Sequence, residues 1–187
     1  PYGLDPNFSP EDIELIDQKR YVFMDKNMAK SGSMGRWMMR CTSSVQVNFD
    51  TSSKDEMEEI VFVADCLHPI ASYLFSNSPF KNKEPAYEKN LRNIIWANTD
   101  NFRCNNLFDQ GIFSKTGLID EYINFFLGAP AIFSFDRKGR AINTKSTIGD
   151  LLLREKDNGT LNKNHILSFL RQIFTNVRIK NLVEIRG

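Results

Sequence analysis

The sequence predicts an α+β protein in which helices flank an antiparallel sheet. Residues 42–50, which read TSSVQVNFD, alternate polar and apolar side chains with the two-residue period of a half-buried strand. Residues 177–186 alternate in the same way near the other end of the chain. Between these two segments, helical spacing and capping signals mix with strand signals in an irregular order, which is typical of the α+β class.

The composition is that of an ordinary globular protein. Of the 187 residues, 41% are hydrophobic and 25% are charged, which suits one domain or a large piece of one. The net charge of +1 gives no reason to expect nucleic acid or a membrane surface as a partner. The three scattered cysteines, Cys41, Cys66 and Cys104, indicate reduced thiols in a cytoplasmic protein. Two separated histidines are too few for a histidine-based metal site.

The two ends of the chain are unusual. It starts at Pro1 without a methionine and stops at Gly187 directly after the apolar-periodic segment RIKNLVEIRG. Natural termini are usually polar and frayed. We therefore expect an internal fragment of a longer protein, with residues 1–187 forming part of a single domain.

The first half of the chain predicts two helices and one strand. Ser9-Pro10-Glu11-Asp12 has the residues of a helix start, so a helix is expected from about Pro10 towards Met28. The segment KSGSMG (30–35) breaks it and leads into a strand around Cys41 to Asp50. A second helix starts at Ser52 or Ser53. Pro69 should kink or interrupt this helix before it continues to Phe75.

The second half predicts helices, a hairpin and a final strand. Residues 87–109 are polar and irregular and are expected to be mostly loop with some helix. The remaining elements are a helix over Gly117 to Leu127, a hairpin turning at Lys138-Gly139, a helix from Thr147 through Leu153, a helix over Asn162 to Phe174, and a strand over Val177 to Arg186.

Charged residues on the final strand are the first candidate site. Glu184 and Arg186 are two residues apart and share one face, while Val183 and Ile185 face the opposite way, towards the core. The carboxylate offers a hard oxygen ligand for Mg²⁺, and the guanidinium a fixed cation for phosphate or carboxylate. A surface ion pair on a half-exposed sheet is the alternative interpretation.

Two amides on the first strand raise a similar question. Gln46 and Asn48 occupy one face of it, although amides are depleted in strands. They indicate either the wall of a polar cleft or a partly solvated strand face.

The segment NLRNIIWANTDNFR (90–103) carries Arg92, Trp96 and Arg103. Two arginines near an indole can hold an anionic substrate by bidentate contacts and stacking. The same residues are also compatible with surface arginines over a buried tryptophan.

Five segments occur in the following order: RYVFMDKNM (20–28), MMRCTSSVQVNFD (38–50), HPIASYLFSNSPF (68–80), LRNIIWANTDNFR (91–103) and RQIFTNVRIKNLVEIRG (171–187). Together they resemble the glutamate–cysteine ligases of plants and many proteobacteria. Each segment alone is a weak signal, but five in the same order with similar spacing are a specific one. The resemblance covers residues 20–187.

The resemblance implies ATP-dependent ligation of the γ-carboxylate of L-glutamate to L-cysteine through γ-glutamyl phosphate, the first step of glutathione synthesis. It implies a glutamine-synthetase-like fold, whose curled antiparallel sheet with flanking helices forms a funnel for nucleotide and amino acid. ATP and Mg²⁺ are the implied cofactors. The implied partners are small-molecule substrates, without nucleic acid or membrane, in a monomer or homodimer.

Roles for individual residues follow from the same resemblance. Glu184 fits a Mg²⁺ ligand, and Arg186 fits the catalytic cation that neutralises the transferring phosphoryl group. The remaining candidates fit substrate binding, with an amino-acid site at Arg92, Trp96 and Arg103 and a funnel wall at Gln46 and Asn48.

Departures from the family pattern leave alternatives open. Asn27 stands where a tyrosine is usual, His68 replaces a glutamine, and NNLFDQGIF (105–113) lacks the usual Thr-Gly. A related carboxylate–amine ligase with another acceptor amine is therefore the alternative, followed by a non-catalytic domain that retains the fold. Because the acidic strand that supplies further ligands in this family is absent from the 187 residues, we expect this fragment alone to be inactive.

Overall fold

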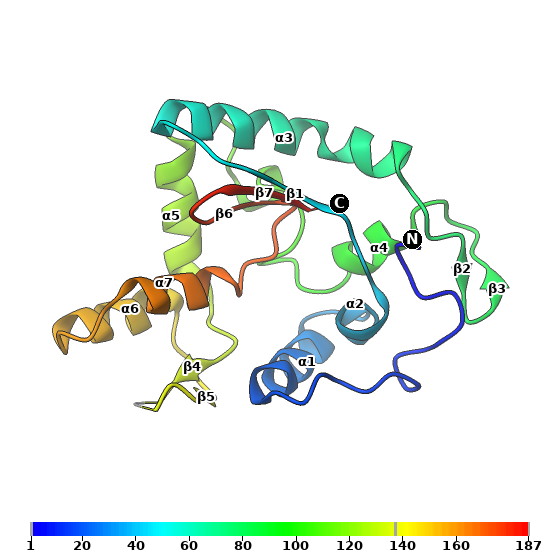
Figure 1. The fold of residues 1–187 in the computed structure, drawn as a ribbon, viewed down its shortest axis with the longest axis horizontal. Coiled ribbons are helices and arrows are strands. Elements are labelled where there is room, and N and C mark those ends of the chain that lie inside the picture. The colour runs from blue at the N-terminus through cyan, green and yellow to red at the C-terminus, as the bar shows by residue number, and fades with distance from the viewer. Residues whose placement is uncertain (1, 137, 187) are drawn as a thin grey trace.

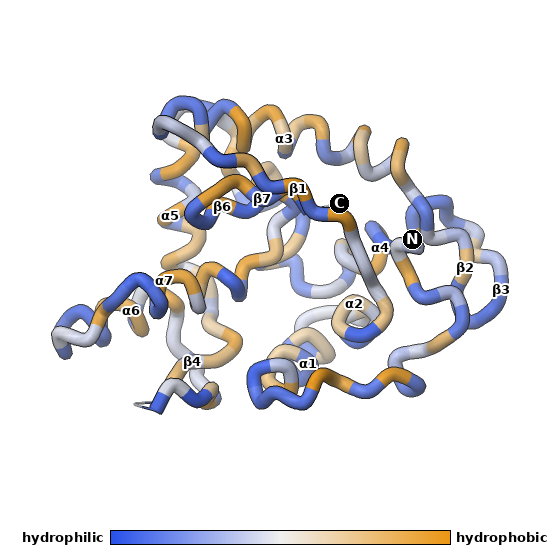
Figure 2. The backbone as a smooth tube through the Cα atoms, in the orientation of Figure 1, coloured by the Kyte–Doolittle hydropathy of each residue, from blue (hydrophilic) through white to orange (hydrophobic). Residues whose placement is uncertain are grey.

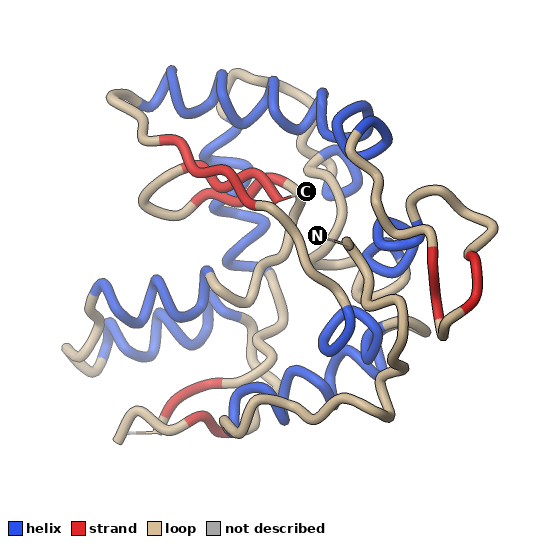
Figure 3. Tube along the Cα trace, turned by 45° about the vertical axis from the view of Figure 1, so that its right-hand side comes forward, coloured by secondary structure: helices blue, strands red, loops and turns tan. Residues whose placement is uncertain are grey.

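A three-stranded antiparallel sheet forms the centre of the protein, in a computed structural model that describes residues 2–136 and 138–186. The strand order is β1 (Gln46–Phe49), β7 (Val183–Arg186) and β6 (Val177–Ile179). Figures 1 and 3 show the long helix α3 (Lys54–Leu74) running along one side of this sheet, with α2 and α4 on the other side. The α+β class predicted from the sequence is confirmed.

The other elements surround the sheet. The helices are α1 (Lys19–Ser31), α2 (Gly35–Cys41), α4 (Leu91–Ala97), α5 (Leu118–Gly128), α6 (Ile148–Asp157) and α7 (Lys163–Leu170), with a short 3-10 helix at Phe108–Gln110. Two small hairpins pair β2 (Phe80–Lys81) with β3 (Glu84–Pro85) and β4 (Ser134–Phe135) with β5 (Ala141–Ile142). No helix within the described ranges combines the length and the apolar character that crossing a bilayer requires.

The strand register divides the sheet into a polar and an apolar face. Directly opposite residues of antiparallel strands share a face. The pairs Gln46↔Arg186, Asn48↔Glu184 and Arg178↔Glu184 therefore lie together, and we call these five residues the polar face. The opposite, apolar face carries Val47, Phe49, Val177, Ile179, Val183 and Ile185.

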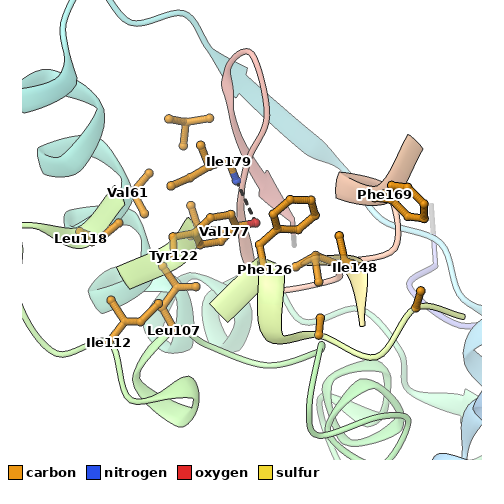
Figure 4. Close-up of a cluster of buried hydrophobic side chains, with 14 of the residues drawn as sticks. Val61, Leu107, Ile112, Leu118, Tyr122, Phe126, Ile148, Phe169, Val177 and Ile179 are labelled. Atoms are coloured by element: carbon orange, nitrogen blue, oxygen red, sulfur yellow. Dashed lines mark hydrogen bonds between the residues drawn. The ribbon is translucent and has the colours of Figure 1, made fainter. Parts of the chain in front are cut away.

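The apolar face packs against helices and contributes to the larger hydrophobic core (Figure 4). Val177 and Val183 are fully buried there with Val61 of α3. Tyr122 of α5 lies in the same core, and its hydroxyl accepts a hydrogen bond of 3.3 Å from the backbone N–H of Ile179. A second core under α1, α2 and α4 is built around Met28, Ile95 and Cys104. The sheet is thus fixed on one face and leaves the other to the polar residues.

Three predicted helix starts are confirmed by their caps. Ser53 accepts the N–H of Glu56, Thr147 forms a reciprocal capping box with Asp150, and the Asn162 side chain caps α7. The helix at α5 and the hairpin around Lys138-Gly139 also form as predicted. The three cysteines are unpaired, as expected.

The first predicted helix is wrong over its first half, because α1 begins only at Lys19. Arg40 explains the difference. Its Nη1 donates hydrogen bonds to the carbonyls of Pro10, at 3.1 Å, and Ile13, at 2.9 Å. A contact from a side chain distant in sequence takes acceptors that a helix would use internally.

Other boundaries also differ from the prediction, since α7 ends at Leu170 and not at Phe174, and α6 continues past Leu153 to Asp157. Residues 35–41 form the helix α2, so the first strand is limited to β1. Helix α3 continues through Pro69 to Leu74 without interruption. The predicted final strand is a hairpin, in which Lys180 N donates to Leu182 O at 2.9 Å and the chain reverses between β6 and β7.

Strand β1 is the exposed edge of the sheet. Val47 and Phe49 lie on the apolar face but remain 48% and 43% exposed, because β1 has a neighbour on one side only among the described strands. Figure 2 shows hydrophobic residues along β1 and α3, and several of these side chains are exposed, among them Leu67 and Ile70 of α3. The sequence predicts a half-buried strand, but all four residues of β1 are exposed to solvent.

Candidate active site on the polar face of the sheet

The centre of the polar face is the carboxylate of Glu184, which is 3% exposed. Its Oε1 accepts hydrogen bonds from Arg178 Nη2 at 2.6 Å and Arg186 Nη1 at 2.7 Å. The ammonium of Lys180, from the turn between β6 and β7, pairs with Oε2. Burial raises the pKa of Glu184, but these cations outweigh it and lower the pKa to about 2. Glu184 is therefore ionised at neutral pH.

Arg186 points from this carboxylate towards helix α4. The carbon of its guanidinium lies 5.5 Å from the centre of the Trp96 ring and 5.9 Å from that of Phe174. Within the described ranges, only Nη1 of this guanidinium donates a hydrogen bond, and its acceptor is Glu184. The group is fixed by one ion pair and two rings while Nε and Nη2 keep donor capacity.

Arg92 approaches the same indole. Its guanidinium carbon lies 5.4 Å from the centre of the Trp96 ring, and its Nε donates a hydrogen bond of 2.8 Å to the carbonyl of Ser43. Burial and the nearby charge of Arg186 lower the pKa of Arg92 to about 10. Two cations that share one ring and repel each other favour an anion between or beside them.

The amides Gln46 and Asn48 complete the polar face from the exposed strand β1. They lie directly opposite Arg186 and Glu184 in the register. Both residues are exposed, and the only hydrogen bond that either side chain makes within the described chain joins Gln46 Nε2 to Ser44 Oγ at 3.5 Å. Their donors and acceptors are open to a ligand.

Arg103 does not join this group, in contrast to the expectation from the sequence. It is 3% exposed, and its Nε donates to Asp100 Oδ2 at 2.8 Å. Its two Nη atoms donate to the carbonyls of Gln172, at 3.3 Å, and Pro130, at 2.8 Å. All three guanidinium nitrogens are used internally, so the residue holds backbone segments together instead of facing a substrate.

The sequence reasoning missed Arg178, Lys180, His68 and Phe174 as neighbours of the site. Arg178 and Lys180 have the same parity as Glu184 and Arg186 within VRIKNLVEIR, which was a usable signal. His68 is buried, and its Nε2–H donates to the carbonyl of Arg186 at 2.8 Å, because a carbonyl can only accept. Nothing in the local sequence indicates that contact.

The described residues do not fit a complete Mg²⁺ site. No group of three or more His, Cys, Asp or Glu side chains within them is arranged to hold a metal ion. Glu184 is the single carboxylate on the polar face, and protein cations contact both of its oxygens. Since Mg²⁺ needs six oxygen ligands, waters included, one engaged carboxylate and two amides are insufficient. What the arrangement can do by itself is bind an anion.

Comparison with known proteins identifies the family. The model of glutamate-cysteine ligase family 2 matches residues 2–187. The chain is 33% identical over 192 residues to glutamate–cysteine ligase A, chloroplastic, of Oryza sativa subsp. indica, covering 99% of this chain and 38% of the relative. It is 34% identical to the chloroplastic glutamate–cysteine ligases of Medicago truncatula and Arabidopsis thaliana, with 99% of this chain matched and 37% and 36% of those proteins.

Two consequences follow from these relatives. The chain spans little more than a third of the length of the curated proteins that it matches. The expectation of a cytoplasmic protein is wrong on this comparison, because the relatives carry chloroplastic names.

Proposed function

Because the chain belongs to glutamate-cysteine ligase family 2, we propose that the full-length protein joins the γ-carboxylate of L-glutamate to the amine of L-cysteine at the expense of ATP. Residues 1–187 form part of its catalytic domain in this proposal. The glutamine-synthetase-like fold, a curled sheet with flanking helices, belongs to the proposal as well and rests on the resemblance alone.

The proposed reaction has two steps. An oxygen of the glutamate γ-carboxylate attacks the γ-phosphorus of ATP, which forms γ-glutamyl phosphate and releases ADP. The cysteine amine then attacks the γ-carbonyl carbon, loses a proton and expels inorganic phosphate. Phosphoryl transfer depends mainly on positioning and on the neutralisation of charge, so this site needs fixed cations more than a nucleophile.

The observation that carries the proposal is the pair of guanidinium groups on Trp96. Arg186 and Arg92 lie 5.5 Å and 5.4 Å from the centre of this ring. Among the described residues, Arg186 uses only Nη1, in its hydrogen bond to Glu184, and its other two guanidinium nitrogens are open. We assign Arg186 to the transferring phosphoryl group and Arg92 with Trp96 to the carboxylate of the amino acid. Gln46 and Asn48 are assigned to polar contacts with the substrate.

ATP and Mg²⁺ are proposed as cofactors from the family resemblance. Glu184 is the one carboxylate on the polar face, and both of its oxygens are already paired with protein cations, so the metal ligands would have to come mainly from outside residues 2–136 and 138–186. We therefore propose that residues 1–187 alone do not catalyse ligation. Expression of this segment and an assay of ADP release with glutamate, cysteine and Mg²⁺ tests that statement, and turnover that Glu184→Gln abolishes would refute it.

A ligase with another acceptor amine is the second candidate. His68, which replaces the glutamine of the family pattern, contacts the backbone carbonyl of Arg186. Asn27, which replaces the tyrosine, donates to Asp100 Oδ2 at 3.5 Å. The His68 departure thus touches the backbone of the site and can change which amine is accepted, whereas Asn27 contacts the carboxylate that pairs with Arg103.

The experiment is a product assay with the full-length protein. It is incubated with ATP, Mg²⁺, glutamate and one amine from a panel that includes cysteine, and the ADP and the γ-glutamyl product are quantified. We expect γ-glutamylcysteine, and γ-glutamyl hydroxamate when hydroxylamine replaces the amine. Another preferred amine supports the second candidate. No ATP-dependent product with any amine, from folded protein, contradicts both and favours a non-catalytic domain.

A further inference from the structure

The hairpin of β6 and β7 holds the carboxylate of Glu184 from several sides. Arg178 lies directly opposite Glu184 in the register and donates to its Oε1, while Lys180 pairs with Oε2. Arg178 is itself fixed, since its Nη1 donates to the carbonyl of Ile173 at 3.1 Å. A path of polar contacts therefore runs from the backbone at Ile173 through Arg178 to Glu184 and on to Arg186.

Through Glu184, these contacts constrain Arg186, which is the side chain assigned to the transferring phosphoryl group. A glutamate with one engaged oxygen can rotate about its terminal torsion, whereas cations on both oxygens fix the plane of the carboxylate. Oε1 receives Arg178 and Arg186 together, so the direction of Oε1 sets the place of Nη1 of Arg186. The aromatic ring of Trp96 then limits the guanidinium from a further side.

We propose that Lys180 and Arg178 are positioning residues of this site, which act through Glu184 to hold the guanidinium of Arg186 against Trp96. This inference rests on the proposed function, in which Arg186 neutralises the transferring phosphoryl group. Lys180 and Arg178 need not touch the substrate. Their effect passes entirely through the carboxylate of Glu184.

Lys180 provides the cleaner test, because 20% of its side chain is exposed whereas Arg178 is buried. In the full-length protein, Lys180→Met removes the charge and keeps an unbranched side chain. We expect kcat to fall by about tenfold to a hundredfold, since a displacement of about 1 Å can cost a hundredfold. KM should change little, and Lys180→Arg should restore most of kcat. The melting temperature should fall by only about 2–4 °C, because Arg178 and Arg186 still pair with Glu184.

Lys115→Met is the matched control. Lys115 pairs with Glu59 at 3.2 Å on the exposed surface, so this variant also takes a cation from a carboxylate, one that is not part of the polar face. It should leave kcat unchanged. A normal kcat in Lys180→Met, or an equal loss in Lys115→Met, would overturn the proposal.

A double variant separates positioning from direct contact. If Lys180 acts only through Glu184, Lys180→Met added to Glu184→Gln should cause no further loss of kcat. Losses that multiply would mean that Lys180 contacts the substrate independently, and the proposal would be wrong.

An arginine side-chain NMR spectrum tests the inference without any assay of activity. The Nε–Hε resonance of Arg186 is identified by its disappearance in Arg186→Lys. Lys180→Met should shift it and speed its exchange with water, whereas Lys115→Met should not. An unchanged resonance contradicts positioning even if the protein is a ligase. A shifted resonance in a protein without ligase activity upholds positioning and rejects the proposed function.

Discussion

Arg103 and Arg186 both contact Phe174 and differ in how their guanidinium groups are used. The backbone N–H of Phe174 donates to the carbonyl of Arg103 at 2.8 Å, and the ring of Phe174 lies 5.9 Å from the guanidinium carbon of Arg186. Every nitrogen of the Arg103 guanidinium donates to an internal acceptor. Arg186 gives one nitrogen to Glu184 and rests on two rings.

The difference shows how one residue type serves stability in one place and binding in another. A buried guanidinium with all nitrogens engaged has already exchanged its water for protein acceptors, and removing it leaves those acceptors unsatisfied. A guanidinium that is held by aromatic rings and still has free N–H donors contributes more to ligand binding than to the stability of the fold. Substitution of Arg103 should therefore lower stability, whereas substitution of Arg186 should lower activity with little effect on stability.

Removal of Arg103 should have the largest effect on stability. Arg103→Met leaves Asp100 buried without its cation, so we expect the free energy of unfolding to fall by roughly 3–5 kcal/mol. Urea denaturation measures this. The control is Arg140→Met, which breaks the exposed 2.7 Å pair with Asp136 and should cost less than about 1 kcal/mol. Equal, small losses in both variants would contradict the structural role of Arg103.

Asp65 sharpens the comparison, because it is a buried carboxylate without a cation. It is 2% exposed, its Oδ2 accepts the N–H of Leu107 at 2.8 Å, and its Oδ1 has no hydrogen-bond partner among residues 2–136 and 138–186. Burial raises the pKa of Asp65 to about 6, whereas the cations around Glu184 lower the pKa of Glu184 to about 2.

The raised pKa sets the sign of a pH effect. Between pH 4 and 6 the folded state binds more protons at Asp65 than the unfolded state, so the stability from this group falls as the pH rises through that range. The loss amounts to roughly 2–3 kcal/mol at about 1.4 kcal/mol per pKa unit. Urea denaturation at pH 4.5 and pH 7 should show it, and Asp65→Asn should reduce it. A variant with the same pH profile as the wild type would exclude Asp65 as the cause.

Arg92 is the intermediate case, with Nε given to the carbonyl of Ser43 and the remaining nitrogens near Trp96. Arg92→Lys should therefore lower the free energy of unfolding by only about 1 kcal/mol, the value of one hydrogen bond. It should also raise the KM for glutamate, because an ammonium cannot reproduce bidentate binding of a carboxylate. Calorimetry and steady-state kinetics measure the two effects. A KM equal to that of the wild type would remove Arg92 from the substrate site.

Local signals explain what could be predicted from the sequence. The caps at Ser53, Thr147 and Asn162 involve contacts within a few residues, and the helices that they start are found. The parity of Glu184 and Arg186 within one strand also depends on local geometry alone, and the register places both on the polar face with Gln46 and Asn48. These features need no knowledge of the tertiary structure.

Contacts between distant residues explain the errors. Arg40 holds the carbonyls of Pro10 and Ile13 out of a helix, and no pattern in residues 9–18 indicates this. Two nitrogens of the Arg103 guanidinium donate hydrogen bonds to the carbonyls of Gln172 and Pro130, which are distant in the chain. Asp100, three residues before Arg103, is a local partner, but it leaves the other two guanidinium nitrogens unexplained, so the sequence alone could not distinguish a structural arginine from a substrate-binding one.

The most direct measurement of the central claim is the turnover of Arg186→Lys in the full-length protein, with its thermal stability recorded on the same sample. The polar face is proposed to act on substrate through the planar guanidinium of Arg186. The variant should therefore lose about a hundredfold or more in kcat for γ-glutamylcysteine formation, as when one transition-state donor is removed. Its melting temperature should stay within about 2 °C of the wild type, because the ion pair to Glu184 can be kept by lysine. Turnover close to the wild type in this folded variant would contradict the account.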